Sequence, residues 1–335
     1  MVRADLIRMM LTACVIALIL SVPGFPLSGG EGPYIVALSS LAFLLGTAEV
    51  LRDNAAQTML PSVVEKPQLE TANGQIWSAE KVMGQFVGPP LAGVMIALAV
   101  PAPFILDAVT FALAAWLIWA MSLAPRVAPM RRKLSVEIAE GWAWMRDHPM
   151  VLRLAITLGC LNAISMMGLS MLVLVGQERL GLSAVGHGVL LTAGAAGGVV
   201  GGLAGPCLIA RIGTTWSLRL SLVLFPLAFV VIGVSYNAYV TGVALFIESL
   251  AALVWNIVTV SWRQRIIPDD LLGRVNSLYR FFGWGLMPLG ALIGGWIVSL
   301  AAPEFGRTVA LQLPYLLGAA ILALIALSGW TKLRL

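Results

Sequence analysis

Charged and titratable side chains are scarce in this chain of 335 residues. Asp, Glu, Lys and Arg make up 11% of it, while 59% of the residues are hydrophobic; soluble proteins hold about 25% charged residues. With two histidines, His148 and His187, the sequence offers no HExxH motif and no catalytic triad, and it has no GxxxxGK[ST] phosphate-binding loop. These absences argue against an enzyme, and we expect no catalytic residues and no cofactor.

Cysteine is also rare. Cys14, Cys160 and Cys207 fall in three different apolar runs, which argues against a disulfide framework or a metal cluster. The net charge of +5 is dispersed over the ends of the apolar runs and forms no basic patch. We therefore predict no metal site and no nucleic-acid partner.

Long apolar runs dominate the sequence. A helix needs about 20 apolar residues to cross the hydrocarbon core of a bilayer, and about ten runs reach that length. The sequence thus predicts an all-α, polytopic membrane protein whose surroundings are the lipid bilayer. The runs lie approximately at residues 4–23, 33–52, 78–100, 103–123, 151–175, 186–210, 215–234, 238–260, 281–300 and 310–330.

The basic residues predict the orientation. If the N-terminus is cytoplasmic, all of the 21 Lys and Arg residues except Arg179 and Arg307 fall on the inner side, as the positive-inside rule requires. We therefore expect a multi-pass protein of the cell membrane with both termini cytoplasmic. A signal peptide is the alternative for the first run, but no A-x-A pattern precedes Pro23, and cleavage would reverse the charge bias.

One long polar segment divides the runs into four and six. Within it, Leu134, Ile138 and Trp142 recur at helical spacing, which predicts an interfacial amphipathic helix. The expected parts are a first bundle at 1–123, a cytoplasmic linker at 124–150 and a six-helix bundle at 151–335.

An internal repeat relates the two halves. Residues 64–73 align without a gap on residues 267–276, ending in Asn73 and Asn276, and each copy precedes a Gly/Pro-rich run. This pattern predicts two parallel halves related by an axis along the membrane normal. Six spans in the second half predict six in the first, so two helices are expected to be missing at the N-terminus.

The first of these Gly/Pro-rich runs carries a packing motif. Gly84 and Gly88 are one helical turn apart, which lets a neighbouring helix approach the backbone. Pro89 and Pro90 then remove two backbone donors and predict a kink. Gly93 follows in the same run.

These residues resemble the major facilitator superfamily, within it the branch of enterobactin-type and macrolide-type exporters. The sequence from Gly84 to Gly93 is similar to the antiporter motif GxxxGPxxGG of the superfamily's fifth helix, with Ala92 in place of one glycine. Residues 52–57, 140–149 and 263–276 are also similar to that branch. The resemblance covers the whole chain and places Met1 just before the family's third helix.

The resemblance implies a two-bundle fold, a small-molecule substrate, and export with protons as the usual coupling ion. In such transporters the fifth, eighth and eleventh helices lie where the halves meet. The eighth helix would present two adjacent glycine faces here: one holds Gly194, Gly198 and Gly202, the other Gly197, Gly201 and Gly205.

Ionisable and amide side chains inside apolar runs are the main candidates for a site, because an ionised group costs about 2.5–3.5 kcal/mol at a helix centre. Glu248 lies about halfway along its run and so near the midplane of the bilayer. We expect it to be a site for a proton or a cationic substrate; the alternative is a protonated carboxyl that forms a hydrogen bond between helices. Asp107, near the outer end, is a second candidate or a carboxylate favoured by the helix dipole. Asn162 and Asn256 are expected either to line the substrate path or to form hydrogen bonds with neighbouring helices.

Charged residues near the inner helix ends are candidates for a cytoplasmic gate. Solvated helix ends are the alternative interpretation of each of them. The candidates are Glu49, Arg52 and Asp53 on one helix end, Glu80 beside Lys81, and Arg211, which matches the second-half loop motif although Ala210 stands where an acidic residue is expected.

Three functions are compatible with these features. The first is a secondary transporter that exports hydrophobic or amphipathic small molecules, drug-like or siderophore-like, by alternating access. The second is a truncated, transport-incompetent remnant or membrane scaffold. The third, an importer of a metabolite, is disfavoured by the antiporter-like motif.

Overall fold

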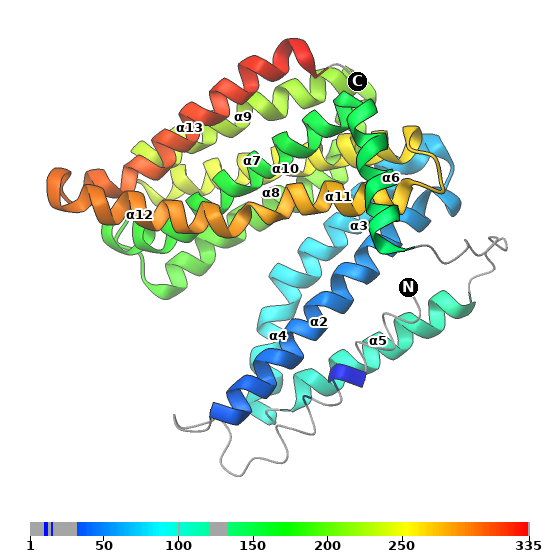
Figure 1. The fold of residues 1–335 in the computed structure, drawn as a ribbon. Helices are drawn as coiled ribbons and strands as arrows, with labels where there is room; N and C mark the ends of the chain where they lie inside the picture. Colours follow the sequence, from blue (N-terminus) through cyan, green and yellow to red (C-terminus); the bar gives the residue numbers. More distant parts are fainter. Residues whose placement is uncertain (1–9, 13–14, 16–31, 100, 121–132, 334–335) are drawn as a thin grey trace. The chain divides into compact units, whose positions relative to one another are not determined.

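The computed structural model describes residues 10–12, 15, 32–99, 101–120 and 133–333 (Figure 1). Every regular element within these ranges is a helix, which confirms the all-α class. Eight helical segments of the described chain are long and apolar enough to cross a membrane, and they correspond to eight of the ten expected runs. The run at 4–23 lies largely outside the described residues, and the run at 33–52 lies within the 28-residue helix α2 (Gly32–Met59).

The chain forms two compact units, made of residues 1–63 with 87–131 and of residues 64–86 with 132–335. This division differs from the one drawn from the sequence, because residues 64–86 group with the C-terminal helices. The first unit holds α2, the short helix η1 (Leu60–Ser62), α4 (Gly88–Leu98) and α5 (Ala102–Ala120).

The second unit is a bundle of long helices that are apolar on most sides. Its first part consists of η2 (Lys66–Gln68), α3 (Leu69–Lys81) and most of the π-helical turn η3 (Val82–Val87). The remaining elements are α6 (Leu134–Asp147), α7 (Pro149–Leu174), η4 (Val175–Arg179), α8 (Ala184–Ile212), α9 (Thr214–Val234), α10 (Ala238–Ile266), α11 (Leu272–Gly285), α12 (Met287–Phe305) and α13 (Arg307–Lys332).

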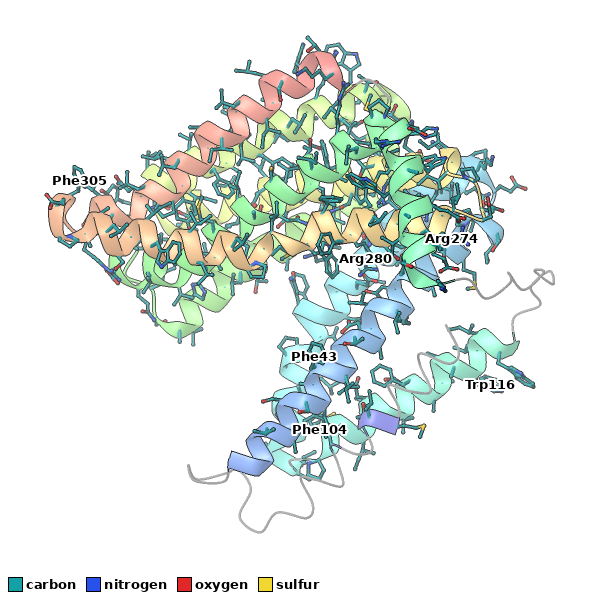
Figure 2. All side chains as sticks on the ribbon, viewed as in Figure 1. Phe43, Phe104, Trp116, Arg274, Arg280 and Phe305 are labelled. Carbon is teal, nitrogen blue, oxygen red and sulfur yellow. The ribbon has the colours of Figure 1, made fainter. Side chains whose placement is uncertain are left out.

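Large side chains that point between these helices form the core of the second unit. Trp255 of α10, Tyr279 of α11, and Phe229 and Tyr315 of α9 and α13 are almost completely buried. The rings of Phe229 and Tyr315 lie 5.8 Å apart. Large apolar side chains such as Phe305, labelled in Figure 2, are exposed on the outside instead; in a membrane protein this is the surface that lipid covers.

Helix α6 lies within the segment expected to be a linker, against the first part of α11 (Figure 1). Arg274 of α11, labelled in Figure 2, bonds the Glu140 carboxylate at 2.7 Å and lies 3.6 Å from Glu137. A side chain at Gly141 would come within 3.2 Å of Arg274 and Leu278. A glycine and an ion pair therefore fix α6 on α11.

Gly198 and Gly202 of α8 pack against α3, whereas Gly194, Gly197 and Gly201 pack against α10. A Cβ at Gly197 or Gly201 would run into the backbone of α10 at Phe246 and Leu250, whereas a Cβ at Gly202 would run into α3. Small residues allow this close approach because no side chain separates the two backbones. Glycines on adjacent faces of α8 thus allow both α3 and α10 to pack closely against it.

The expected kink in the Gly84–Gly93 motif takes the form of a change of helix type. The π-helical turn η3 ends at Val87, and α4 begins at Gly88 with proline in its first turn. Proline is tolerated there because the first-turn amides need no intrahelical partner. A Cβ built at Gly84 has no described atom within 4 Å, and the packing role of Gly84 and Gly88 remains a prediction.

The two arginines that depart from the charge pattern lie in or beside η4. Arg307, the first residue of α13, makes a bidentate ion pair with Glu178 at 2.7 and 2.8 Å. Arg179 donates to the backbone carbonyls of Ile232 and of Gly233, the latter at 2.9 Å. These carbonyls end α9 and have no intrahelical donor, so Arg179 closes that helix end.

Candidate functional site

Glu248 lies in the middle of α10 and is directed toward α7. Its carboxylate accepts a hydrogen bond from Ser165 Oγ of α7 at 2.8 Å. A hydroxyl can donate to an ionised carboxylate or accept from a protonated one, so this contact suits both protonation states. The structure thus places the first-choice carboxylate between helices, with a partner that the sequence did not indicate.

A buried amide joins α3 to α10. Asn73, whose exposed fraction is 3%, donates from Nδ2 to Gln264 Oε1 at 2.8 Å and to Ser261 Oγ at 3.0 Å. All three side chains are buried, and buried polar groups are costly unless they are paired. This contact therefore specifies how α3 docks on α10.

An ion pair lies one turn before this amide. Arg265 of α10 binds the Glu70 carboxylate of α3 and also donates to the Lys66 carbonyl at 3.0 Å. Both side chains are largely shielded, with exposed fractions of 30% for Arg265 and 13% for Glu70. The ion pair extends the polar contact between the two helices toward the start of α3.

On its other side α3 meets α8 through backbone contacts. A Cβ at Gly74 would collide with the Gly202 carbonyl, and one at Gly202 would collide with Ser78 Oγ. Ser78 Oγ in turn donates to the Val199 carbonyl at 3.2 Å. We call the contacts of α3 with α8 and α10 the α3 cluster, which comprises Glu70, Asn73, Gly74, Ser78, Gly202, Ser261, Gln264 and Arg265.

The two deep asparagines occupy different surroundings. Asn162 of α7 donates to the Gly283 carbonyl of α11 at 2.8 Å, between two helices. Asn256 donates to Ala252 one turn earlier in its own helix, at 3.0 Å. Asn162 thus forms a hydrogen bond between two helices, whereas the hydrogen bond of Asn256 stays within its own helix.

The other predicted site residues are described by their own helices. Asp107 is exposed on α5, and its backbone carbonyl accepts from Thr110. Arg52 and Asp53 are neighbours on α2, 3.4 Å apart. The remaining candidates are exposed on their helices: Glu49 on α2, Glu80 on α3 and Arg211 in the last turn of α8.

Sequence reasoning missed most of the α3 cluster, although one signal was present. The internal repeat ends each copy in asparagine, and both asparagines bond α10: Asn73 reaches Gln264, and Asn276 accepts from Arg263 Nη1 at 2.6 Å. Glu70 and Arg265 lie 195 positions apart, and no spacing rule connects residues so distant. Their pairing depends on the close approach of α3 to α8 and α10.

Apolar helices long enough to cross a bilayer, several of them joined by close glycine contacts, define a polytopic membrane protein. The family description that matches the chain is the Major Facilitator Superfamily, over residues 3–288. The chain therefore belongs to the Major Facilitator Superfamily, a family of membrane transporters, and not to an enzyme family. No curated protein sequence matches it.

Solved transporter structures share the fold. A bacterial homologue of the iron transporter ferroportin, in an outward-facing state, has 17% identity and a TM-score of 0.70, over 99% of this chain and 80% of its own. The transporter FucP, in an outward conformation, has 13% identity and a TM-score of 0.72, over 97% and 82%. The nucleoside transporter NupG has 12% identity and a TM-score of 0.60, over 99% and 83%.

Proposed function

We propose that this protein is a secondary active exporter that exchanges hydrophobic or amphipathic small molecules for protons across the cell membrane. Glu248 is the residue on which the proposal rests. It is a carboxylate within a membrane helix, paired with Ser165 of another helix at 2.8 Å. Ionisable groups in such positions are expensive and typically mark proton or substrate pathways.

The proposed role of Glu248 is to bind and release the coupling proton. The Ser165 hydroxyl stabilises the ionised carboxylate by donating to it and the protonated one by accepting from it. Substrate would pass beside the polar groups of the same bundle, with Asn162 and Asn256 as further candidates along the path. Asp107, on α5 of the first unit, remains a separate candidate. Apolar and small side chains elsewhere would suit amphipathic molecules.

Alternating access requires a contact that forms and breaks at one end of the path. We propose that the α3 cluster is this gate on the cytoplasmic side, with both termini cytoplasmic. Two observations support this proposal. Helices α3, η3 and α4 belong to one apolar span, Lys66–Leu98. The residues of α10 that bond Asn73 of α3 lie 188 and 191 positions away from it in the sequence. The charged groups Glu49, Arg52, Asp53, Glu80 and Arg211 remain candidates for the rest of the gate.

Proton-driven flux in proteoliposomes tests this function. The protein would be reconstituted with a proton gradient, and ethidium, a lipophilic fluorescent cation, would report substrate movement. We expect ethidium to move against the direction of the protons in the wild type. In Glu248→Gln that coupling should be lost while downhill exchange persists, whereas Glu304→Gln, at an exposed site, should behave like the wild type.

The direction of flux separates the alternatives. The E. coli relative in the structural comparison is described as a fucose:proton symporter, so a symporter that imports a metabolite is the competing transport function. If protons and substrate move in the same direction, the import hypothesis replaces the export hypothesis. If a panel of lipophilic cations, sugars and nucleosides shows no gradient-driven flux, the scaffold interpretation would take the place of both.

A further inference from the structure

A cation lies between two tryptophans where α9 and α13 pack side by side (Figure 1). The guanidinium carbon of Arg219, on α9, is 4.9 Å from the ring centroid of Trp216 and 4.9 Å from that of Trp330, on α13. The two indole rings meet edge to face, with centroids 6.0 Å apart. The attraction between the guanidinium charge and the aromatic faces fixes the arginine at this place.

The charge of Arg219 has no acidic partner among the described residues. Its Nη2 donates to the Trp330 carbonyl at 2.8 Å, a carbonyl of the last helical turn that has no intrahelical donor. Its Nε is buried and forms no hydrogen bond within the described part of the chain. A guanidinium has five N–H donors, so this one hydrogen bond leaves both the charge and most of the donors available to a ligand.

The surroundings of Arg219 place it at the depth of the lipid headgroups. It lies five residues after Thr214, the first residue of α9, which is about 8 Å along the helix axis. Trp330 and Lys332 belong to the last turn of α13, and the exposed fractions of Trp216 and Trp330 are 55% and 41%. Half-exposed tryptophans beside basic residues at the ends of membrane helices mark the boundary between hydrocarbon and headgroups.

A groove lies between α9 and α13 on the surface of the second unit. Its volume is about 560 Å³, and every side chain that lines it is aliphatic. Helix α13 contributes four alanines to the lining, and these small side chains leave the groove open. They are Ala319, Ala320, Ala323 and Ala326.

The groove begins next to the cation. Val223, which lines the groove, follows Arg219 by one turn of α9, and Leu327, also in the lining, precedes Trp330 by one turn of α13. Residues one turn apart lie on the same face of a helix. An aliphatic channel thus leads from the guanidinium along the side of the bundle, where Leu327 is 72% exposed.

We propose that this groove binds an anionic phospholipid, with the lipid phosphate on Arg219 and one acyl chain along the groove. Charge complementarity selects this occupant, because an arginine without an acidic partner ends the groove and Lys332 follows nearby in the sequence. Arginine binds phosphate through two parallel hydrogen bonds, and basic pockets between membrane helices bind anionic headgroups. The inference does not depend on the proposed exporter function.

Lipid binding to the whole protein, followed by native mass spectrometry, tests the headgroup. Purified, lipid-free protein would be titrated with phosphatidylglycerol, which is anionic, and with phosphatidylcholine of the same acyl chains, which is zwitterionic. We expect the wild type to prefer phosphatidylglycerol by about fivefold or more. Arg219→Gln should lose this preference, whereas Arg219→Lys should keep it. Arg146→Gln removes the same charge from a side chain that is 71% exposed on α6 and should behave like the wild type.

A second pair of variants tests the groove and keeps the Trp330 carbonyl bond of Arg219 intact. Ala323→Phe places a ring in the groove and should lower the retention of both lipids. Leu324→Phe places a ring on the adjacent face, where Leu324 is 65% exposed and outside the groove lining, so lipid retention should not change.

Each result decides the inference. It fails if the wild type binds both lipids equally, if Arg219→Gln keeps the preference, or if Ala323→Phe retains phosphatidylglycerol like the wild type. Displacement of phosphatidylglycerol by inorganic phosphate would show a site for a free anion instead of a lipid. A wild-type dimer that Ala323→Phe dissociates would assign the groove to a second copy of the chain and overturn the proposal.

Discussion

Asn73 and Gln264 are 191 positions apart in the chain, yet Nδ2 of the first donates to Oε1 of the second at 2.8 Å inside the bundle. The contact joins the short helix α3 to the last turn of α10. It is surrounded by an ion pair on one side and a backbone contact between glycines on the other. A polar bond in such a place fixes one docking position for α3.

Removing this amide should loosen α3. Asn73→Ala deletes the donor to Gln264 and Ser261, at a cost of about 1–3 kcal/mol for a buried hydrogen-bonded group. Amide hydrogen exchange in α3, followed by mass spectrometry, should accelerate by roughly fivefold to 150-fold. Gln75→Ala, exposed on the same helix, is the control, and equal exchange in both variants would contradict the assignment.

A single methyl group should separate α3 from α8. In Gly74→Ala the new Cβ collides with the Gly202 carbonyl, and backbone cannot give way as a side chain can. We expect a loss of about 1–3 kcal/mol, as for overpacked positions, measured as a lower Tm of the purified protein. Gly188→Ala on α8, where nothing lies within 4 Å, should leave the Tm unchanged or raise it, because alanine favours helix by up to about 1 kcal/mol.

The two arginines beside η4 should differ in their importance. Arg307→Ala breaks an ion pair whose members are 48% and 35% exposed, and exposed pairs contribute about 0–1 kcal/mol. Arg179→Ala leaves the end carbonyls of α9 without their charged donor, and hydrogen bonds to charged groups contribute about 1.5–3 kcal/mol. Thermal unfolding should therefore show the larger loss for Arg179→Ala, and added salt should lessen the Arg307 effect. The reverse order of the two losses would refute this comparison.

Ser165 should influence coupling more than stability. Ser165→Ala removes the donor to Glu248, worth about 1.5–3 kcal/mol when the acceptor is charged. Proton-driven flux should fall by about tenfold or more, and its pH profile should change. Ser170→Ala lies on the same helix and loses a bond to the Met167 carbonyl within its own turn; a similar profile change there would show that the effect is not specific to Glu248.

The spans and the glycine faces of this protein are properties of the sequence itself. Apolar runs of about 20 residues form helices in a bilayer because a helix satisfies its backbone hydrogen bonds within a single segment. The spacing of Gly197, Gly198, Gly201 and Gly202 likewise places them on two adjacent faces, and the structure fills those faces with two different helices. A carboxylate within such a run, Glu248, stands out for the same reason, since its cost demands a partner.

Only the tertiary structure selected the partners. Ser165 belongs to α7, and no periodicity along α10 or α7 predicts which hydroxyl meets Glu248. Arg265 and Glu70 lie among many charged residues near helix ends, and the close approach of α3 to α8 and α10 made them a pair, while Glu80 and Arg211 stayed exposed. Local sequence determines which face of a helix is polar or small; the identity of the facing helix depends on how all the helices pack together.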